Sequence, residues 1–364
     1  MISIIHLIPT IDRGGAENHL QSLIEKQISN NYSIVVIHLK GKPYWKSYFE
    51  ENGVKVFKYK SIFQLFSIIK KHKIQVVHAH LQVPEILSSI THLFFPKFEL
   101  VFSRHNDAYS RFLPKGINPI FYQLISKRAS KIICISKNVY DFCKNNLDLN
   151  KNKLQIIYYG ISRETYAPSN IDDNQFKKLN KELKLKDEFI IGTVARLHPQ
   201  KSLHTLITAF KTFSKQVPNS KLFIVGEGHL ESELKSLASN LGVIDKVIFT
   251  GKRSEIPVFY KIFDVFVLCS IYEGLGLVLL EAMAAEKPII GTNAGAIPDI
   301  ISNCGVIVET ENPNAISQEL IRLYKNPDLV KQMTKKGVND IKEKFTLERM
   351  YLQTDQIYKQ VLNL

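Results

Sequence analysis

The residue types best suited to chemistry gather between positions 270 and 284, where two glutamates enclose two glycines. The stretch reads S-I-Y-E-G-L-G-L-V-L-L-E-A-M-A and contains Glu273, Gly274, Gly276 and Glu281. It follows an apolar run typical of a buried strand, and it opens a run typical of a helix. Glycines let a ligand approach the backbone, and the free N–H groups at a helix start suit a diphosphate. This loop is therefore the first candidate binding site.

Glu281 is expected about two turns inside that helix. Its neighbours Leu279, Leu280, Ala282 and Met283 leave it little polar face. A carboxylate in apolar surroundings is costly unless it meets a partner, and a pair of sugar hydroxyls would be such a partner. The alternative is an ordinary solvent-facing glutamate, which the apolar neighbours disfavour.

A second glycine pair, Gly226 and Gly228, lies in I-V-G-E-G. A dinucleotide fingerprint G-x-G-x-x-G would need a further glycine at the position that Glu231 occupies, so we do not expect a dinucleotide cofactor. No other cofactor is expected. We expect Gly226 and Gly228 to line a nucleotide cleft.

Near the start of the chain, Gly14 and Gly15 end a first apolar run and precede Ala16 and Glu17. The same physics applies here, with glycines for close approach and a helix start for phosphate or sugar. A tight turn without a ligand is the alternative.

Two histidines, His78 and His80, flank Ala79 at the end of an expected strand and would share one face of it. Such a pair could be half of a metal site. However, no Cys, Asp or Glu stands nearby at ligand spacing, and the chain contains no D-x-D. We therefore expect no metal.

These residues need a scaffold, and the chain alternates short β-branched runs with helical stretches throughout. This pattern predicts parallel sheets covered by helices on both faces. Expected strands in the first half are 2–7, 33–39, 55–59, 74–78, 100–103, 131–136 and 154–158, and in the second half 189–195, 221–225, 246–250, 264–269, 288–291 and 305–308.

A chain of 364 residues exceeds the roughly 250–300 residues at which a single core stops growing, so two domains are expected. The lysine-rich, aperiodic segment 169–187 breaks the alternation. We predict an α/β protein with a first domain over 1–168, a second over 169–345 and a final helix over 346–364, after a break near Phe345 and Thr346. Ligands usually bind in clefts between such domains.

Composition excludes several classes of protein. Charged residues make up 23% of the chain and no low-complexity tract occurs, which argues against extended disorder. No apolar stretch reaches the roughly 18 residues of a membrane span. The four cysteines lie too far apart for C-x-x-C and fall mostly in apolar runs. Buried thiols indicate a reducing compartment, most simply the cytoplasm.

The order and spacing of several further motifs add a family resemblance. E-G-x-G-L-V-L-L-E-A-M-A is similar to the E-x7-E signature of the family 4 retaining glycosyltransferases of GT-B fold. G-G-A-E, H-A-H, I-G-T-V-A-R-L-H-P-Q-K, I-V-G-E-G, V-I-F-T-G and G-A-I-P-D occur in the same order as in that family. The resemblance implies two Rossmann-like domains facing a central cleft, with the last helix packing back on the first domain.

The resemblance also implies roles for particular residues. Glu281 would bind the nucleotide ribose, Glu273 and His80 would contact the donor sugar, and Arg196 with Lys201 would neutralise the diphosphate. The predicted donor-nucleotide site consists of Glu281, Gly14, Gly15, Gly226, Gly251, Arg253, Gly274, Leu275, Gly276 and Leu277. His105, at the end of the next expected strand, would contribute to acceptor binding. Ordinary surface charges are the alternative for Arg196 and Lys201.

The sequence departs from the family pattern at two positions. The usual G-G-x-x-E reads Gly295-Ala-Ile-Pro-Asp299, and the glycine expected after Lys201 is Ser202. Asp299 has a shorter reach than glutamate, so its role near the donor is open.

The expected reaction is transfer of a sugar from a nucleotide diphosphate, UDP or GDP, onto a glycan or lipid-linked acceptor in cell-envelope polysaccharide or lipopolysaccharide synthesis. No positioned base for inversion and no carboxylate nucleophile is evident in the first half. What the resemblance itself implies is retention, with the departing diphosphate helping to deprotonate the acceptor. A nucleotide-sugar 2-epimerase of the same fold and a non-catalytic binder of nucleic acid or anionic surfaces are the competing functions.

Charge points to one further partner. Residues 1–165 carry 23 Lys and Arg against 11 Asp and Glu, so most of the net charge of +14 lies in the first half. The segment 61–73 is apolar at helical spacing and ends in lysines, and aromatic-basic stretches follow at 94–97 and 111–115. Core packing of Ile62, Leu65 and Ile69 is one interpretation, and docking on an anionic membrane surface is the other. Nucleic acid is not expected as a partner.

Overall fold

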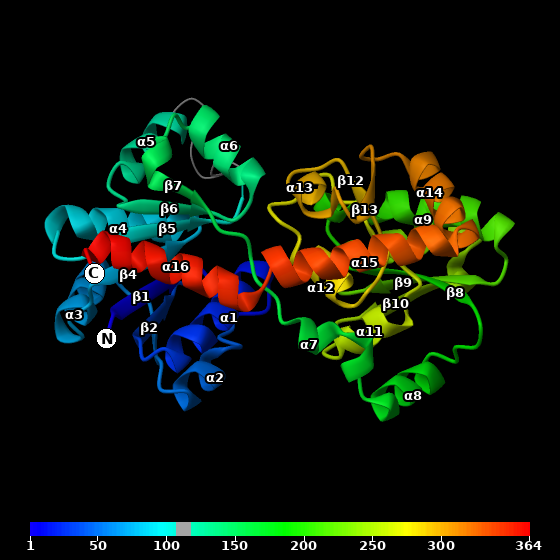
Figure 1. Ribbon diagram of the computed structural model, residues 1–364, viewed down its shortest axis with the longest axis horizontal. Helices are drawn as coiled ribbons and strands as arrows, with labels where there is room; N and C mark the ends of the chain where they lie inside the picture. Colours follow the sequence, from blue (N-terminus) through cyan, green and yellow to red (C-terminus); the bar gives the residue numbers. More distant parts are fainter. Residues whose placement is uncertain (107–117) are drawn as a thin grey trace. The chain divides into compact units, whose positions relative to one another are not determined.

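The structure, a computed structural model, describes residues 1–106 and 118–364. These residues form two compact units (Figure 1). Unit 1 comprises residues 1–160 and 347–364, and unit 2 comprises residues 161–346. Each unit has a parallel sheet with helices on its faces, as the alternating pattern predicted.

Unit 1 is built on a seven-stranded sheet in the order β3-β2-β1-β4-β5-β6-β7. Its strands are β1 (Ser3–Ile8), β2 (Ser33–His38), β3 (Lys55–Lys58), β4 (Val76–His80), β5 (Glu99–Arg104), β6 (Lys131–Cys134) and β7 (Leu154–Ile156). The strand order reverses direction between β1 and β4, which pair in register from Ile4 with Val76 to Leu7 with Ala79. This switch point is where open parallel sheets bind ligands, at the carboxyl ends of the strands.

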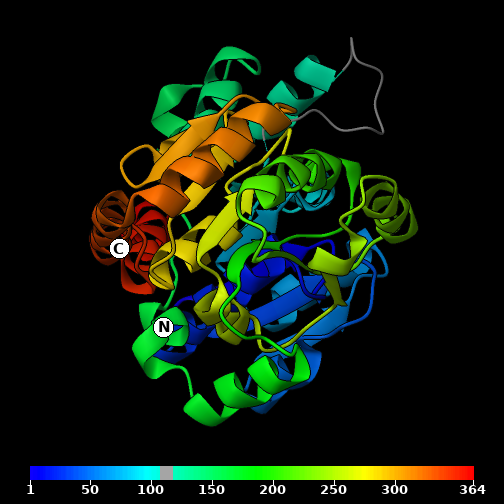
Figure 2. The same ribbon diagram turned by 90° about the vertical axis from the view of Figure 1, so that its right-hand side faces the viewer.

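The described helices of unit 1 are α1 (Gly15–Ser29), α2 (Lys46–Glu51), α3 (Ile62–Lys71), α4 (Gln82–Phe94), α5 (Asn118–Ser126), α6 (Lys137–Asn145) and α16 (Leu347–Leu362). Helix α16 carries the C-terminus (Figure 2) and packs against α1. Its Met350, Tyr351, Ile357 and Tyr358 belong to the same buried cluster as Leu20 of α1. The apolar face of α16 thus explains why the end of the chain returns to unit 1.

Unit 2 has a six-stranded sheet in the order β10-β9-β8-β11-β12-β13. The strands are β8 (Phe189–Val194), β9 (Ser220–Val225), β10 (Val247–Gly251), β11 (Val265–Leu268), β12 (Ile289–Thr292) and β13 (Gly305–Val308). Here the order reverses between β8 and β11. Both of these strands are apolar runs without alternation, the pattern of strands buried on both faces.

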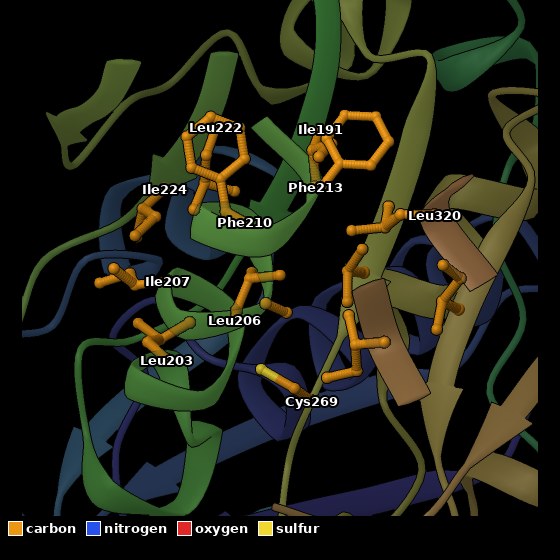
Figure 3. Packing of buried hydrophobic residues seen from close by; sticks show 14 of the residues in the cluster. Ile191, Leu203, Leu206, Ile207, Phe210, Phe213, Leu222, Ile224, Cys269 and Leu320 are labelled. Atoms are coloured by element: carbon orange, nitrogen blue, oxygen red, sulfur yellow. The ribbon is translucent and has the colours of Figure 1, made fainter. Parts of the chain in front are cut away.

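The helices of unit 2 are α7 (Arg163–Tyr166), α8 (Asp173–Glu182), α9 (Leu203–Gln216), α10 (Glu231–Asn240), α11 (Ile256–Ile262), α12 (Leu277–Ala284), α13 (Ile297–Ile301), α14 (Pro313–Lys325) and α15 (Pro327–Lys344). Its core lies between the sheet, α9 and α14. Phe210 and Phe213 of α9 face Ile191 and Leu222 of the sheet in this cluster (Figure 3).

The structural division differs from the predicted domain boundary. Unit 2 begins at Ile161, whereas the sequence indicated residue 169. Helix α7 accounts for the difference because it packs on α11 and α12. The chain crosses back between Phe345 and Leu347, where the predicted helix break is confirmed: α15 ends at Lys344 and α16 begins at Leu347. Among the described residues, no helix combines the length and the apolar character needed to cross a bilayer.

Candidate active site

The switch point of unit 2 joins two of the predicted loops. The loop after β8 carries Arg196 and Lys201, and the loop after β11 carries Glu273. Gln200 ties the loops together, because its backbone carbonyl accepts from the Ile271 N–H at 2.9 Å and its side-chain amide donates to the Tyr272 carbonyl at 2.8 Å. The predicted cations and carboxylate of this unit therefore lie at one edge of one sheet.

Lys201 and Glu273 form an ion pair in which the side chains are only 11% and 13% exposed. The Ser270 hydroxyl donates to the same carboxylate oxygen, Oε2, at 3.1 Å. Lys201 was predicted to neutralise a diphosphate. In the structure its ammonium group holds Glu273. Lys201 and Ser270 both bind Oε2, and neither binds Oε1.

Ser202 stands where the family pattern has glycine, and its surroundings show how serine is accommodated there. Its backbone is left-handed, with φ 46°, the conformation that glycine adopts most easily. The Ser202 hydroxyl lies 2.9 Å from the Thr205 hydroxyl in the first turn of α9. Serine thus occupies the glycine position, with a local hydrogen bond.

The loop around Gly295 fixes the backbone of Glu273. The Ala296 N–H donates to the Glu273 carbonyl at 2.9 Å. A Cβ atom on Gly295 would lie 2.0 Å from that carbonyl oxygen, and Gly295 has φ +55°. The first residue of G-A-I-P-D must therefore be glycine for the two loops to pack. Asp299 lies in the short helix α13, and its predicted role stays open.

Arg196 is exposed at the end of β8, and no ion pair to it is found within residues 1–106 and 118–364. Its backbone carbonyl accepts from the His198 N–H at 2.8 Å, which fixes the turn that carries it. A cation at a strand end with no carboxylate beside it is suited to an incoming anion.

Gly226 and Gly228 are required by backbone packing within unit 2. A Cβ atom on Gly226 would lie 2.0 Å from the Ala195 carbonyl oxygen, and one on Gly228 would lie 2.3 Å from the Leu197 carbonyl oxygen. These glycines let the loops after β8 and β9 touch, as the Leu197 N–H to Glu227 carbonyl bond of 3.0 Å shows. Their predicted contact with a nucleotide stays a prediction.

Arg253, which was predicted to belong to the donor-nucleotide site, pairs with two carboxylates in the structure. Its guanidinium binds the Glu182 carboxylate at 2.7 and 3.1 Å and also pairs with Glu255. These bonds tie α8 to the loop after β10. Gly251 has φ +66°, and its carbonyl accepts from the Gly226 N–H at 3.0 Å. The space where a Cβ of Gly251 would lie is open.

The loop from Gly274 to Leu277 opens α12. Gly276 is the N-cap, with φ +82°, and the Leu275 side chain is buried. A left-handed N-cap of this kind favours glycine, and it turns the chain from the Glu273 loop directly into the helix.

Glu281 is buried in α12, as the sequence predicted. The Tyr260 hydroxyl of α11 donates to its Oε2 at 2.9 Å, and Tyr166 of α7 interacts with the same carboxyl group. Burial raises the pKa of Glu281, and the two tyrosine hydrogen bonds act in the opposite direction. Both tyrosines were missed, because their proximity to Glu281 depends on how three helices pack.

In unit 1, Gly14 is the N-cap of α1 with extended backbone, and Gly15 begins the helix. A Cβ on Gly14 would meet the end of the Glu17 side chain at 2.4 Å, whereas Gly15 faces open space. The Thr10 hydroxyl donates to Glu17. The glycine turn at the carboxyl end of β1 is thus present.

His78 and His80 share one face of β4, as predicted, and their ring centroids lie 4.1 Å apart. His6 of β1, which was not among the predicted residues, pairs with His78 across the sheet. Ligand atoms of His6, His78 and His80 lie within 4.8 Å of one another. The sequence did contain a signal for this contact: His6 stands inside the apolar run S-I-I-H-L-I. A histidine there is costly to bury unless it has a polar partner.

Hydrogen bonds use the nitrogens of these buried rings. His78 contacts the Tyr358 hydroxyl and the Ser103 hydroxyl, each at 2.7 Å. His80 lies 3.0 Å from His6 and 3.3 Å from His105. His80 was expected to reach toward the donor sugar, and in the structure it is fully buried with both nitrogens engaged. Burial lowers the pKa of His80 and His78 well below the usual value.

His105, the predicted acceptor residue, borders a small pocket at the end of β5. The pocket is also lined by Glu85, Arg104 and Tyr122. Arg104 and Glu85 form a buried ion pair with nitrogen–oxygen distances of 3.1 and 3.3 Å. The pocket has hydrogen-bonding groups, and its predicted use for an acceptor is untested.

Two consecutive parallel-sheet units, each with glycine loops and charged groups at the carboxyl edge, define the GT-B class of glycosyltransferases. Two family profiles match in succession: "Glycosyltransferase Family 4" over residues 13–165 and "Glycosyl transferases group 1" over residues 174–340. The chain belongs to glycosyltransferase family 4.

Named relatives cover most of the chain. A UDP-Gal:alpha-D-GlcNAc-diphosphoundecaprenol alpha-1,3-galactosyltransferase of Escherichia coli is 26% identical over 307 residues, 82% of this chain and 79% of the relative. An N-acetyl-alpha-D-glucosaminyl L-malate synthase of Bacillus anthracis is 25% identical over 88% of this chain and 86% of its own length. The crystal structure of Anabaena Alr3699/HepE in complex with UDP superposes with a TM-score of 0.86 at 20% identity and covers 99% of this chain and 100% of its own, which supports the fold.

Proposed function

We propose that the chain is a retaining glycosyltransferase that moves a sugar from a UDP-sugar, with a GDP-sugar as the alternative donor, onto a glycan or lipid-linked acceptor in cell-envelope polysaccharide or lipopolysaccharide synthesis. One observation carries this proposal: at the unit 2 switch point Glu273 is held by Lys201, while Arg196 on the same loop as Lys201 stays exposed. An oriented carboxylate and a solvent-facing cation together suit a sugar linked to a diphosphate.

The donor would be bound through its charge and its hydroxyls. Arg196 and the N–H groups at the start of α12 would take the diphosphate, and Glu273 would accept from a sugar hydroxyl through Oε1. Glu281 would accept from the ribose hydroxyls. These groups lie in one unit, and they supply the fixed charges that a departing nucleoside diphosphate needs.

In the proposed mechanism the acceptor oxygen forms its bond to the anomeric carbon on the face from which the diphosphate leaves. The bond between the anomeric carbon and the diphosphate oxygen breaks, and the proton of the acceptor hydroxyl passes to that departing oxygen. Arg196 stabilises the growing phosphate charge, and the Lys201 ammonium keeps the Glu273 carboxylate oriented. This mechanism uses no divalent cation and no protein nucleophile.

The names of relatives support the choice of donor and acceptor. The E. coli relative is named for UDP-galactose and a diphosphoundecaprenol-linked sugar, and the Anabaena structure contains UDP. A nucleotide-sugar 2-epimerase would release free sugar without an acceptor, which separates the two functions experimentally.

The test is a thermal-shift and transfer panel with UDP, GDP and ADP and their sugars. At a ligand concentration of about 100 Kd, binding stabilises the native protein by about 2.7 kcal/mol. We expect one nucleotide to shift the wild type, Arg196→Ala to lose most of the shift, and Arg322→Ala, an exposed arginine of α14, to keep it. A panel in which no nucleoside diphosphate binds, or in which Arg196→Ala binds as well as the wild type, contradicts the donor site.

We also propose that unit 1 docks reversibly on anionic membrane lipid at the cytoplasmic face. Of the three residues predicted to pack in the core, Leu65 and Ile69 of α3 are buried and Ile62 is partly buried, whereas Phe63 on the same helix is 79% exposed. Further exposed apolar side chains lie on α4, which contacts α3: Ile90, Leu93 and Phe94. The predicted stretch 111–115 lies outside the described residues.

Lysines border this apolar surface. Lys70, Lys71 and Lys73 follow at the end of α3, and Lys97 follows α4; all four are exposed. Aromatic and aliphatic side chains beside lysines suit the boundary between acyl chains and anionic headgroups. Binding to anionic vesicles should weaken with salt and in Phe63→Ser, and it should persist in Ile307→Ser, an exposed isoleucine of unit 2. Equal binding to neutral and anionic vesicles at low salt would overturn the docking proposal.

A further inference from the structure

An open pocket lies at the amino edge of the unit 1 sheet, where β4 and β5 begin, and we call it the amino-edge pocket. Its volume is about 370 Å³, within the range of roughly 300–1,000 Å³ that is usual for small-molecule sites. Because β4 and β5 run parallel, this edge is opposite the carboxyl edge that carries the glycine turn of the candidate active site. The lining residues that matter here are Lys73, Ile74, Gln75, Lys97, Phe98 and Glu99.

Hydrogen-bond donors dominate the polar lining of the pocket. Lys73 and Lys97 are exposed, and neither forms an ion pair within the described part of the chain. The side-chain carbonyl of Gln75 accepts from the Ser3 N–H at 3.0 Å. This bond fixes the orientation of the amide group and leaves its NH₂ group as a donor. The lining thus offers two cations and one amide donor.

Among the described residues that line the pocket, only Glu99 is acidic. Its Oε2 accepts from the Ser130 hydroxyl, which holds the carboxylate beside β6. One held carboxylate does not balance two lysines, so the pocket has an excess of positive charge. Such a pocket favours an anion over a neutral ligand.

The pocket adjoins the exposed apolar surface of α3 and α4. Ile74 and Phe98 at its inner side are both 4% exposed. Leu93 and Phe94, at the end of α4, are 54% and 65% exposed and precede the lining residue Lys97 by only a few positions. The stretch after α4 is fastened to α3 by a stacked pair of rings, Phe66 and Phe95, with centroids 3.5 Å apart. Apolar and cationic groups therefore meet at the mouth of the pocket.

Further cations lie at the same edge of the sheet. Lys55 opens β3, Lys131 opens β6, and Lys151 and Lys153 directly precede β7. The amino ends of parallel strands share one edge, so these charges add to the field around the pocket. Such a field draws an anionic surface toward this edge.

We propose that the amino-edge pocket binds the phosphate headgroup of an anionic lipid when unit 1 docks on the membrane. Lys73 and Lys97 contact the phosphate oxygens, and the Gln75 amide donates to the headgroup. The side chains of Leu93 and Phe94 lie among the acyl chains beside it. This inference rests on the proposed membrane docking and goes further, because it names the lipid group that is recognised and the residues that recognise it.

A structural role for the lysines is the competing interpretation. Cations at the end of a helix complement its dipole, and this effect is confined to the last turn. Lys70 and Lys71 occupy the last turn of α3 and fit that role. Lys73 lies two residues beyond α3, and Lys97 lies three residues beyond α4, which ends at Phe94. Helix ends therefore account for Lys70 and Lys71 better than for the two lysines of the pocket.

The test measures partitioning of the full chain onto phosphatidylcholine vesicles that contain about one-fifth phosphatidylglycerol. A lysine that is merely near an anionic surface contributes about fivefold to binding. We expect Lys71→Gln, on the same face but outside the pocket, to weaken binding by about fivefold or less. Lys97→Gln should weaken it about 20-fold or more, because it also loses a hydrogen bond to a charged group. Glu99→Gln should strengthen binding, because it removes the acid of the lining.

The outcomes separate the pocket from the docking itself. If the wild type does not bind these vesicles, both proposals fail. If Lys71→Gln and Lys97→Gln weaken binding equally, docking by charge remains and the headgroup pocket is overturned. Soluble glycerophosphoglycerol, the headgroup without acyl chains, should bind far more weakly than the vesicles; equal affinity would mean that the site takes a free anion and not a lipid.

Thermal melting provides the remaining control. Lys73 and Lys97 are exposed, so Lys73→Gln and Lys97→Gln should melt at the same temperature as the wild type. A lowered melting temperature together with unchanged vesicle binding would assign these lysines to the structural role and overturn the headgroup site.

Discussion

The Tyr260 hydroxyl donates a 2.9 Å hydrogen bond to the Glu281 carboxylate in the interior of unit 2. The same hydroxyl also lies 3.0 Å from the Val278 carbonyl one turn earlier in α12. Within the described structure, the Glu281 carboxylate has tyrosine hydrogen-bond donors but no cation beside it. The free-energy cost of burying its charge is therefore only partly compensated. The carboxylate remains available to accept further hydrogen bonds from a ligand.

Glu281→Gln should therefore stabilise the protein and abolish donor binding. The folded-state pKa of Glu281 is raised by burial above its ordinary value of 4.5, so the ionised group destabilises the native state at higher pH. We expect the variant to be more stable by roughly 1 kcal/mol at about pH 8. The gain should shrink as the pH falls through the raised pKa, and vanish below 4.5.

Calorimetric melting across this pH range measures the effect, with Glu309→Gln as the control at an exposed position. A stability gain that does not change with pH, or a variant that still binds the nucleotide like the wild type, contradicts this account of Glu281.

Gly295→Ala should loosen the Glu273 loop. The new Cβ would lie 2.0 Å from the Glu273 carbonyl oxygen, at a residue with φ +55°. We expect a loss of more than about 1 kcal/mol of stability together with weaker donor binding. Gly242→Ala is the matched control, because Gly242 has φ +70° and open space around the Cβ position. Equal melting temperatures for the two variants would show that the backbone of Gly295 is not tightly packed against the Glu273 carbonyl.

Much of the scaffold was predictable because buried parallel strands read as apolar β-branched runs. All thirteen expected strands are present, seven in unit 1 and six in unit 2. The burial of Glu281 was also predictable from its apolar neighbours. Helix α7 was not predictable, since its four residues are too few to show a helical period. Because α7 belongs to unit 2, the boundary between the units lies before it, earlier than predicted.

The partners of the site residues were not predictable. Lys201 and Arg253 read as free cations in the sequence, and only the folded loops bring Glu273 and Glu182 to them. His6 contacts His80 through strand register, 74 positions away in sequence. Such contacts depend on which strands become neighbours, and no local pattern encodes that.

Glu85→Gln should strongly destabilise unit 1. Glu85 and Arg104 form a two-point ion pair inside the unit, and neutralising Glu85 leaves the buried Arg104 charge with only the Ser126 hydroxyl and the Cys143 thiol as partners. We expect the free energy of unfolding to fall by about 3–5 kcal/mol, and most of this loss to be recovered in the double variant Glu85→Leu/Arg104→Met.

Trp45, the only tryptophan of the chain, packs against the unit 1 core, so urea unfolding followed by its fluorescence reports on this unit. A single variant as stable as the wild type would exclude the buried pair as a stabilising contact.

Unit 1 should lose stability on mild acidification because its buried histidines must stay neutral. The pKa of His6 is about 4 in the folded protein against 6.5 ordinarily, so the unfolded chain binds a proton first. The free energy of unfolding has its full value above about pH 6.5. It falls as the pH approaches 4, by about 3 kcal/mol for His6 alone. His19, His78, His80 and His105 have lowered pKa values and add to the loss. Urea unfolding followed by Trp45 fluorescence should show a steep pH dependence that His6→Leu makes shallower and that His204→Leu, at an exposed position of unit 2, leaves unchanged. A free energy of unfolding that stays constant from about pH 7 to about pH 5 would mean that these imidazoles are not held neutral.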